Sequence, residues 1–130
     1  MRLLNREKIL IVEDDPGISS ALKVRLASAG YRPRVVDSGG AAVQSAAENP
    51  PDLVILDLKL PDMHGYEVCR LLRKQYRSWE VPVLMLTGLD DPQSRLEGFE
   101  TGADAYLTKP CRPTDLLKTV RLLLEHENMN

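Results

Sequence analysis

The sequence predicts an α/β protein whose core is a parallel sheet of five strands. Five short apolar runs alternate with five longer segments of helical period, which is the pattern of consecutive strand and helix units. Three of these runs are continuously apolar, as expected for strands that helices cover on both faces. We therefore expect a three-layer sandwich in which the sheet lies between two layers of helices.

The apolar runs define the strands, and local signals define the first helix. As strands, the runs cover residues 9–12, 34–36, 53–56, 81–86 and 105–107. The first helix follows at once, because Asp15 can cap its start and Pro16 suits its first position. Gly30 can end this helix in a left-handed conformation. Its apolar stripe is formed by Ile18, Ala21, Leu22, Leu26 and Ala29.

The second and third helices also carry recognisable features. Ser38 opens a short helix rich in alanine, which Asn49 and Pro50 close. The third helix covers residues 65–76, and the basic side chains on it and just after it are expected to face solvent. The alternative is that they form a docking surface. These side chains are Arg70, Arg73, Lys74 and Arg77.

The last two helices are bounded by proline and glycine. The fourth begins at Asp91 and Pro92 and stops at Gly102. The fifth begins at Pro113 and continues to the end of the chain with an apolar stripe.

The composition is that of an ordinary globular domain. Of the 130 residues, 43% are hydrophobic and 28% are charged, and this length matches a single domain. The sequence contains no linker and no repeat, so we expect one domain over residues 1–130 and no output domain within this chain. The two cysteines exclude a disulfide scaffold and a four-ligand zinc site made of cysteines.

The charge balance and the first apolar run bear on partners and location. A formal net charge of −2 provides no overall basic field, so we expect no direct binding of nucleic acid and no association with a membrane. The run 9–12 meets three acidic residues too soon to form the core of a signal peptide or a spanning helix. The sequence therefore predicts a cytoplasmic protein.

Polar residues stand at four of the five strand ends. Glu13 and Asp14 follow the first strand, and Asp57 follows the third. Thr87 follows the fourth strand and Lys109 follows the fifth. In an open parallel sheet, ligands bind just beyond the carboxyl ends of the strands. These side chains should therefore converge on one site.

Three carboxylates at one edge need a compensating cation. Two like charges at about 4 Å repel by about 4 kcal/mol at the effective dielectric of a protein surface. Mg²⁺ suits such a site, because it prefers hard oxygen ligands and accepts few carboxylates while keeping several waters. We assign direct ligation to Asp14 and ligation through water to Glu13. The alternative is that residues 13–15 form only an acidic loop that caps a helix.

Lys109 and Thr87 complement these carboxylates. Lys109 can pair with Asp57 at rest and with a phosphoryl oxygen during transfer, and Thr87 can donate its hydroxyl to another phosphoryl oxygen. A carboxylate can accept a phosphoryl group to form an aspartyl phosphate. Asp57 lies within an apolar run, where a charge without a purpose is most unfavourable, so we predict that Asp57 is the acceptor.

Other functions that use similar acids fit the sequence less well. A metal-dependent nuclease and an aspartyl-phosphate phosphatase both need an acidic group two residues beyond a key carboxylate, where this chain has Lys59. A nucleotide-binding protein needs a phosphate loop after the first strand, and the acids at 13–15 would repel the phosphate.

Four segments surround the polar residues at the strand ends: residues 9–15 with Glu13 and Asp14, residues 53–65 with Asp57, residues 83–88 with Thr87, and residues 102–110 with Tyr106 and Lys109. In these four segments the sequence resembles the receiver domain of two-component response regulators. The segments occur in the order and spacing of the family and cover almost the whole chain. The resemblance implies a flavodoxin-like (βα)5 fold with strand order 2-1-3-4-5. One departure is Glu13, where the family more often has aspartate.

The resemblance also implies roles for individual residues. The backbone carbonyl of Lys59 would be a further ligand of Mg²⁺, and the Lys109-Pro110 bond would be cis. Thr87 and Tyr106 match a switch pair, in which the phosphoryl group draws in the Thr87 hydroxyl and Tyr106 rotates into the vacated space. The alternative for Tyr106 is a half-buried tyrosine at the sheet edge.

By this resemblance the chain is a signalling domain rather than an enzyme. It would accept a phosphoryl group from a histidine kinase or phosphotransfer protein, assist its own dephosphorylation, and control a downstream effector protein or domain. A homodimer through the face formed by the fourth and fifth βα units is also compatible with the resemblance. The alternative is a receiver-like interaction module that acts without phosphorylation, whose usual sign is loss of the acceptor or the lysine; Asp57 and Lys109 are both present.

Overall fold

The structure confirms the predicted α/β class and strand order. It is a computed structural model that describes residues 7–128, with side chains described for residues 7–125. Five parallel strands form one sheet in the order β2-β1-β3-β4-β5. The strands are β1 (Lys8–Val12), β2 (Arg32–Val36), β3 (Leu53–Leu56), β4 (Val83–Thr87) and β5 (Ala105–Thr108). The helices are α1 (Pro16–Ser28), α2 (Gly39–Glu48), α3 (Gly65–Gln75), α4 (Pro92–Glu100) and α5 (Pro113–Asn128).

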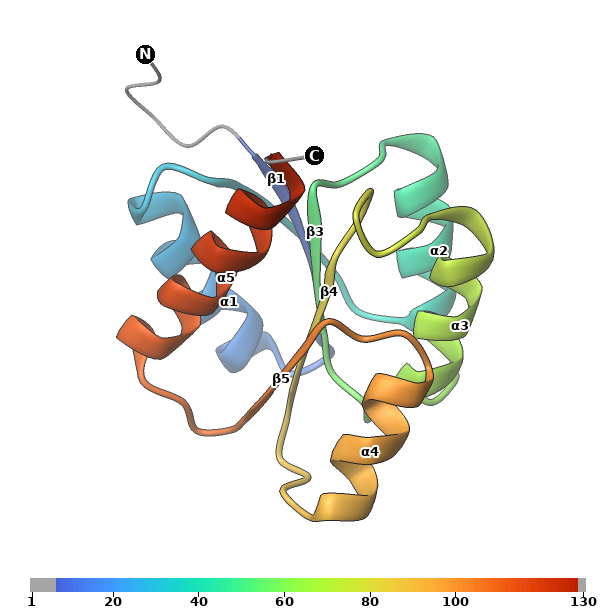
Figure 1. The fold of residues 1–130 in the computed structure, drawn as a ribbon. Helices are drawn as coiled ribbons and strands as arrows, with labels where there is room; N and C mark the ends of the chain where they lie inside the picture. The colour runs from blue at the N-terminus through green and yellow to red at the C-terminus, as the bar shows by residue number, and fades with distance from the viewer. Residues whose placement is uncertain (1–6, 129–130) are drawn as a thin grey trace.

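Helices cover both faces of the sheet, as the continuous apolar runs predict. Helices α1 and α5 lie together on one face, whereas α2, α3 and α4 lie on the other (Figure 1). Within residues 7–128, no helix is long and apolar enough to cross a lipid bilayer.

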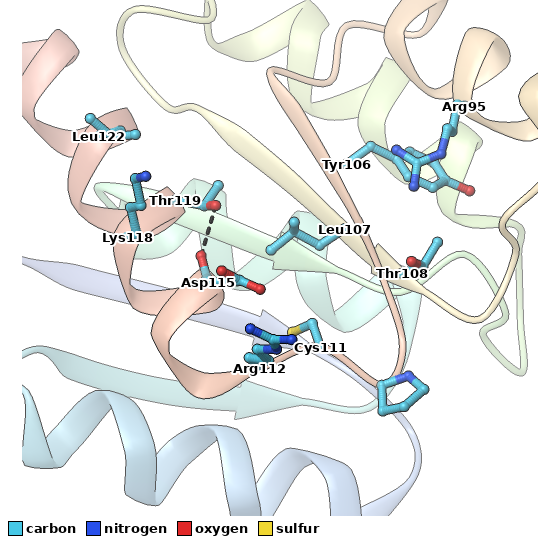
Figure 2. A pocket seen from close by; sticks show the side chains of 11 residues that line it. Arg95, Tyr106, Leu107, Thr108, Cys111, Arg112, Asp115, Lys118, Thr119 and Leu122 are labelled. Carbon is cyan, nitrogen blue, oxygen red and sulfur yellow. Dashed lines mark hydrogen bonds between the residues drawn. The ribbon is translucent and has the colours of Figure 1, made fainter.

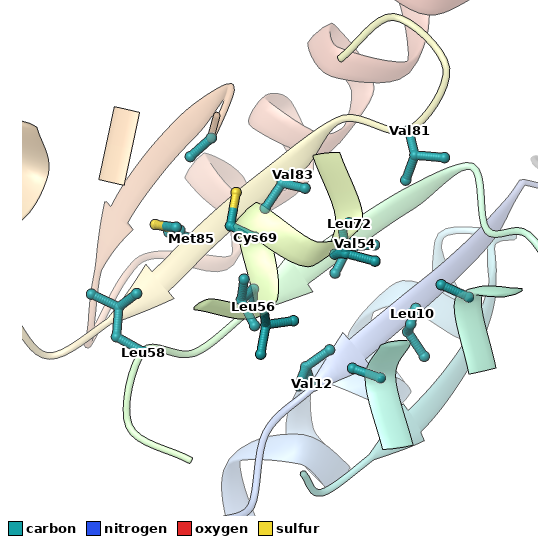
Figure 3. Packing of buried hydrophobic residues seen from close by; sticks show 14 of the residues in the cluster. Leu10, Val12, Val54, Leu56, Leu58, Cys69, Leu72, Val81, Val83 and Met85 are labelled. Atoms are coloured by element: carbon teal, nitrogen blue, oxygen red, sulfur yellow. The ribbon is translucent and has the colours of Figure 1, made fainter. Parts of the chain in front are cut away.

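Alternate residues of the central strands fill two separate apolar cores, because successive side chains of a strand point to opposite faces. Leu10 and Val54 belong to the core beneath α2 and α3 (Figure 3). Ile9 and Leu53, on the same two strands, belong to the core beneath α1 and α5. All four side chains are fully buried. A strand buried on both sides needs no polar face, which explains the continuously apolar runs.

The helix ends follow the predicted local signals. Asp15 Oδ1 accepts hydrogen bonds from the backbone N–H groups of Gly17 and Ile18, at 2.9 and 3.2 Å. Gly30 has a φ of 94° after α1, and Gly102 has a φ of 108° after α4. Both glycines therefore occupy the left-handed region, as expected for residues that end a helix.

Strand boundaries differ from the prediction in the edge strand β2 and in the inner strand β4. Strand β2 begins two residues early, because Arg32 and Pro33 pair with Lys8 and Ile9 of β1. The apolar pattern misses these residues because β2 is an edge strand, where polar side chains reach solvent and a proline is tolerated. The run 81–86 becomes the strand Val83–Thr87.

Two side chains differ from their predicted orientation. Ala21, which belongs to the predicted inward stripe of α1, is exposed. Arg73 does not face solvent with the other basic residues of α3; its Nη2 lies 2.6 Å from Asp104 Oδ2, and its Nη1 donates to the Val81 carbonyl at 2.7 Å. Helical periodicity places the Cβ atom, but a long side chain can reach back to partners on other segments.

Leu84 provides a test of the core packing. Leu84 is fully buried in β4, so Leu84→Ala should lower the free energy of unfolding by about 2–5 kcal/mol through lost apolar contact and a cavity. Urea unfolding followed by circular dichroism measures this change. Leu122→Ala is the matched control, because Leu122 is 52% exposed, and its effect should stay within about 0.5 kcal/mol. Equal destabilisation by the two substitutions would contradict the core assignment.

Candidate phosphoacceptor site

Backbone pairing brings the acidic residues together at the carboxyl edge of the sheet. Val12 pairs with Leu56 across β1 and β3, and the Asp57 N–H donates to the Val12 carbonyl at 3.0 Å. Glu13 and Asp14 follow β1, and Asp57 follows the neighbouring strand β3, so the three residues lie at the same edge. One oxygen of each of these three carboxylates lies within 4.8 Å of the others. The structure thus brings together the acids that the sequence predicts at one site.

The three carboxylates differ in burial and in hydrogen bonding. Glu13 is 3% exposed and Asp57 is 7% exposed, whereas Asp14 is on the surface. Glu13 Oε2 accepts a hydrogen bond from the Asp15 N–H at 3.2 Å, and Asp57 Oδ1 accepts one from the Leu58 N–H at 2.8 Å. Each of the two buried carboxylates therefore has one oxygen held by the backbone and a second oxygen facing the lysine.

Lys109 places its ammonium group between the two buried carboxylates. Its Nζ lies 2.5 Å from Glu13 Oε1 and 3.2 Å from Asp57 Oδ2. The sequence predicts the pair with Asp57, which is present, but not the shorter contact with Glu13. With Asp14 included, three carboxylates and one ammonium leave an excess of two negative charges. This excess, together with the hard oxygen donors, suits a divalent cation.

Burial and charge pairing act in opposite directions on the lysine. Burial by itself lowers the pKa of Lys109, but the hydrogen bond with Glu13 and the charge of Asp57 outweigh it and raise that pKa. Burial raises the pKa of Glu13, because its hydrogen bond with Lys109 compensates for only part of the lost hydration. Lys109 is therefore protonated at neutral pH and supplies a fixed positive charge.

The other site residues implied by the sequence also lie near this edge. The Lys109 N–H donates to the Thr87 carbonyl at 2.7 Å, so the ends of β4 and β5 hold these two residues beside each other. The Lys109-Pro110 bond is cis, as the resemblance implies. Lys59 is exposed two residues after Asp57, and it forms an isolated antiparallel bridge with His64.

Thr87 and Tyr106 are joined through the backbone of Leu89. Thr87 is buried, and its Oγ1 accepts a long hydrogen bond of 3.5 Å from the Leu89 N–H. Tyr106 is 6% exposed, so it is not the half-buried tyrosine of the alternative, and its hydroxyl donates to the Leu89 carbonyl at 2.8 Å. Burial raises the pKa of Tyr106 to about 12, which keeps this hydroxyl protonated. Sequence reasoning missed this bridge, because no local pattern marks a backbone contact of this kind.

A groove of about 540 Å³ runs beside Tyr106, along α4, β5 and α5. Figure 2 shows Arg95 and Tyr106 together near one part of the groove, and Asp115, Lys118 and Leu122 along α5. The Arg95 guanidinium lies 5.0 Å from the centre of the Tyr106 ring. The buried tyrosine therefore borders a surface that a partner can reach.

Comparison with known proteins identifies this arrangement. Residues 9–121 match the family described as the response regulator receiver domain. The chain belongs to this family. RpaA of Synechocystis, described as a DNA-binding dual master transcriptional regulator, is 44% identical over 117 residues, which are 90% of this chain and 48% of RpaA. The DNA-binding response regulator MtrA of Mycolicibacterium smegmatis is 41% identical over 119 residues, which are 92% of this chain and 51% of MtrA.

Solved structures share the fold of this receiver domain. The BeF3-activated N-terminal receiver domain of Klebsiella pneumoniae RstA is 36% identical, with a TM-score of 0.85, over 90% of this chain and 97% of that one. A CheY-like receiver domain protein of Methanospirillum hungatei is 30% identical, with a TM-score of 0.90, over 96% of this chain and 98% of that one. The flavodoxin-like receiver fold predicted from the sequence is thereby confirmed.

One prediction about partners is wrong. A net charge of −2 favours no direct binding of nucleic acid, yet RpaA and MtrA are both described as DNA-binding proteins. The receiver domain spans about half the length of these curated relatives. Net charge is an average over the residues counted, so a near-neutral balance in this chain does not separate it from relatives that are described as DNA-binding.

The pairing of Lys109 with Glu13 can be measured in the metal-free protein. Lys109→Ala should leave the buried Glu13 carboxylate without its cation and lower the free energy of unfolding by about 1–3 kcal/mol. Adding Glu13→Gln should recover part of this loss, because a neutral amide needs no cation. Urea unfolding in the presence of a chelator gives the double-mutant cycle.

Lys118→Ala is the control for this cycle, because Lys118 lies exposed on α5. Its effect should add to that of Glu13→Gln without coupling. Simple additivity between Lys109→Ala and Glu13→Gln would contradict a direct interaction between the two side chains.

Proposed function

We propose that this receiver domain accepts a phosphoryl group on Asp57 and responds by changing the surface formed by α4, β5 and α5. The proposal rests on the contact of Lys109 with Asp57, which sets a nearly buried carboxylate beside a fixed cation. Asp14 supports the proposal as well. An ion pair with a purely structural role would not need a third, exposed carboxylate with an oxygen within 4.8 Å of those of Glu13 and Asp57. Membership of the receiver family supports a role in two-component signalling.

The proposed donor is the phosphohistidine of a histidine kinase or phosphotransfer protein. A carboxylate oxygen of Asp57 attacks phosphorus; a P–O bond forms, the P–N bond breaks, and the imidazole nitrogen takes the electron pair. The Oδ2 atom suits this attack, because Oδ1 accepts the Leu58 N–H while Oδ2 faces Lys109. Water that attacks the phosphorus of the product would form a new P–O bond and break the P–O bond to Asp57. This step would release inorganic phosphate and restore the carboxylate, so the same site would assist its own dephosphorylation.

The acidic cluster would hold Mg²⁺ during this transfer. We assign Asp14 and Asp57 as direct ligands, Glu13 as a ligand through water, and the backbone carbonyl of Lys59 as a further ligand. The fit rests on the three carboxylate oxygens that lie within 4.8 Å of one another. When bound, Mg²⁺ would neutralise negative charge that builds up on the phosphoryl oxygens.

Lys109 and Thr87 would orient the transferred group. The Lys109 ammonium lies 3.2 Å from Asp57 Oδ2, so a small shift lets it donate to a phosphoryl oxygen bound there. The Thr87 hydroxyl can donate to a second phosphoryl oxygen. Movement of this hydroxyl toward the phosphoryl group would weaken its 3.5 Å contact with the Leu89 N–H.

Leu89 would carry this change to the surface. Its N–H contacts Thr87 and its carbonyl accepts the Tyr106 hydroxyl, so the two side chains of the proposed switch share one peptide segment. Tyr106 borders the groove along α4, β5 and α5 (Figure 2). Phosphorylation would therefore shift the population of orientations of Tyr106 and alter the face that an effector contacts.

The proposed output is control of transcription. RpaA and MtrA are described as DNA-binding regulators, and this receiver domain spans about half of each. On that basis, the chain would be the phosphorylation-controlled part of a DNA-binding transcriptional regulator.

Asp57→Asn tests the assignment of the acceptor. With Mg²⁺ and acetyl phosphate, the unchanged protein should gain one phosphoryl group in intact-mass measurements, and excess chelator should prevent this. Asp57→Asn should gain none, because an amide cannot form the acyl phosphate. Asp115→Asn, which alters an exposed carboxylate on α5, should be labelled like the unchanged protein.

Two outcomes would overturn this assignment. Labelling of Asp57→Asn would place the acceptor elsewhere. The lack of any adduct on the unchanged protein at saturating acetyl phosphate would favour an interaction module that acts without phosphorylation.

Thr87→Ala tests the route through Leu89. This variant should still be phosphorylated on Asp57, but the amide resonances of Leu89 and Tyr106 should shift less on phosphorylation than in the unchanged protein, as measured by NMR. Thr119→Ala is the control, since the Thr119 hydroxyl donates within α5 to the Asp115 carbonyl. Shifts of full size at Tyr106 in the Thr87→Ala variant would exclude this route.

A further inference from the structure

The loop between β3 and α3 is anchored to the start of α2 by Asp62. Asp62 Oδ1 accepts a hydrogen bond from the Gly39 N–H, and Oδ2 accepts one from the Gly40 N–H, both at 2.8 Å. These are the first two residues of α2, whose N–H groups have no acceptor within the helix. A carboxylate is also favoured there by the helix dipole. The two backbone hydrogen bonds lower the pKa of Asp62, so it is ionised when it makes them.

Met63 adds an apolar contact to this anchor. Gly39 is buried, and a Cβ atom added there would overlap the Met63 side chain and lie 2.8 Å from Val68 Cγ2. The loop residue Met63 therefore packs directly on the backbone of α2. Helices α2 and α3 lie side by side on this face of the sheet (Figure 1). The loop is held both by charge-assisted hydrogen bonds and by close packing.

Backbone contacts join the two ends of the same loop next to Asp57. Lys59 forms an antiparallel bridge with His64, and the Gly65 N–H donates to the Leu58 carbonyl at 2.8 Å. Along the chain, Lys59 therefore lies between Asp57 and Asp62. Asp57 precedes the loop, and Asp62 connects the loop to α2 by hydrogen bonds. A backbone carbonyl has no side-chain rotamer with which to adapt to a metal, so its position is set by the conformation of the loop.

The start of α2 is itself connected to the acidic loop after β1. The Glu13 N–H donates to the Val36 carbonyl at 3.1 Å, and Val36 is the last residue of β2. Through Gly39 and Gly40, Asp62 thus connects the loop that carries Lys59 to a segment already hydrogen-bonded to Glu13. Asp62 therefore adds a second connection, by way of α2 and the end of β2, between two loops that the pairing of β1 with β3 already brings together.

We infer that Asp62 is a positioning residue for divalent metal binding, an inference that rests on the metal site of the proposed function. Asp62 touches neither the metal nor the phosphoryl group; it fixes the loop so that the Lys59 carbonyl is already placed when the cation arrives. Outer groups that orient metal ligands typically change metal affinity by about 10-fold to 100-fold when removed. Because this loop keeps the Lys59 and His64 bridge, Asp62→Ala should weaken Mg²⁺ binding by roughly 10-fold, at the lower end of that range.

The test compares Asp62→Ala with Ser38→Ala. Ser38 Oγ accepts the Ala41 N–H at 3.1 Å, so Ser38→Ala removes a cap from the same end of α2 without touching the loop. Titration calorimetry with Mg²⁺ should give a larger dissociation constant for Asp62→Ala than for the unchanged protein. The dissociation constant of Ser38→Ala should equal that of the unchanged protein. In metal-free protein, amide hydrogen exchange at Gly39 and Gly40 should rise in Asp62→Ala, together with exchange at the Gly65 amide of the loop.

Saturating Mg²⁺ separates positioning from a direct role in transfer. With acetyl phosphate at saturating Mg²⁺, Asp62→Ala should reach the same extent of phosphorylation as the unchanged protein. Equal Mg²⁺ affinity in Asp62→Ala and the unchanged protein would overturn the inference, and so would an equal loss of affinity in Ser38→Ala. If the affinities differ as expected but the unchanged protein gains no phosphoryl group, the proposed function fails while the positioning role of Asp62 stands.

Discussion

The contact of Lys109 with Glu13 and Asp57 is the constraint on which the site depends. The carboxylates come from neighbouring strands whose backbones are hydrogen-bonded, so they cannot separate to relieve their repulsion. Unit charges at about 4 Å repel by about 4 kcal/mol at an effective dielectric of 20. The compensating ammonium comes from the end of β5 and has to reach past β4 to the ends of β3 and β1. One lysine therefore links the charge balance of the site to the far side of the sheet.

Two loops beside this charge cluster differ in freedom, and the difference matches their proposed roles. The loop after β3 is held by Asp62 and by the packing of Met63 on Gly39. The loop after β4 contains Gly88, which is exposed, and no atom beyond its chain neighbours lies within 4 Å of where a Cβ would stand. Preorganised ligands favour metal binding, whereas a switch needs a segment that can move. The side that would hold the metal is thus fixed, and the side that leads to Leu89 is open.

The proposed route from Thr87 to the outer face at Tyr106 is short, because both side chains contact the backbone of one residue. Thr87 and Tyr106 contact opposite ends of the same residue, Leu89, and the Lys109 N–H is bonded to the Thr87 carbonyl. The strands themselves are packed between two apolar cores, which resist displacement. On the proposed function, a change of charge at Asp57 would therefore be expressed in the loops after β4 and β5 and would not spread through the sheet.

The sequence by itself determined the class of fold, the N-terminal caps of α1, α2 and α4, and the set of residues at the strand ends. These features are local: a cap such as Asp15 depends on its neighbours, and parallel strands bring their carboxyl ends to one edge whatever the loops do. Only the tertiary structure decided which side chains touch. The shortest hydrogen bond of the Lys109 ammonium is to Glu13, which is 96 residues away in the sequence. Arg73 turns inward to Asp104, which is 31 residues away in the sequence. The anchor made by Asp62 is of the same kind, since it depends on how two helices pack. Such contacts follow from the distances and directions that packing imposes, which periodicity and composition do not contain.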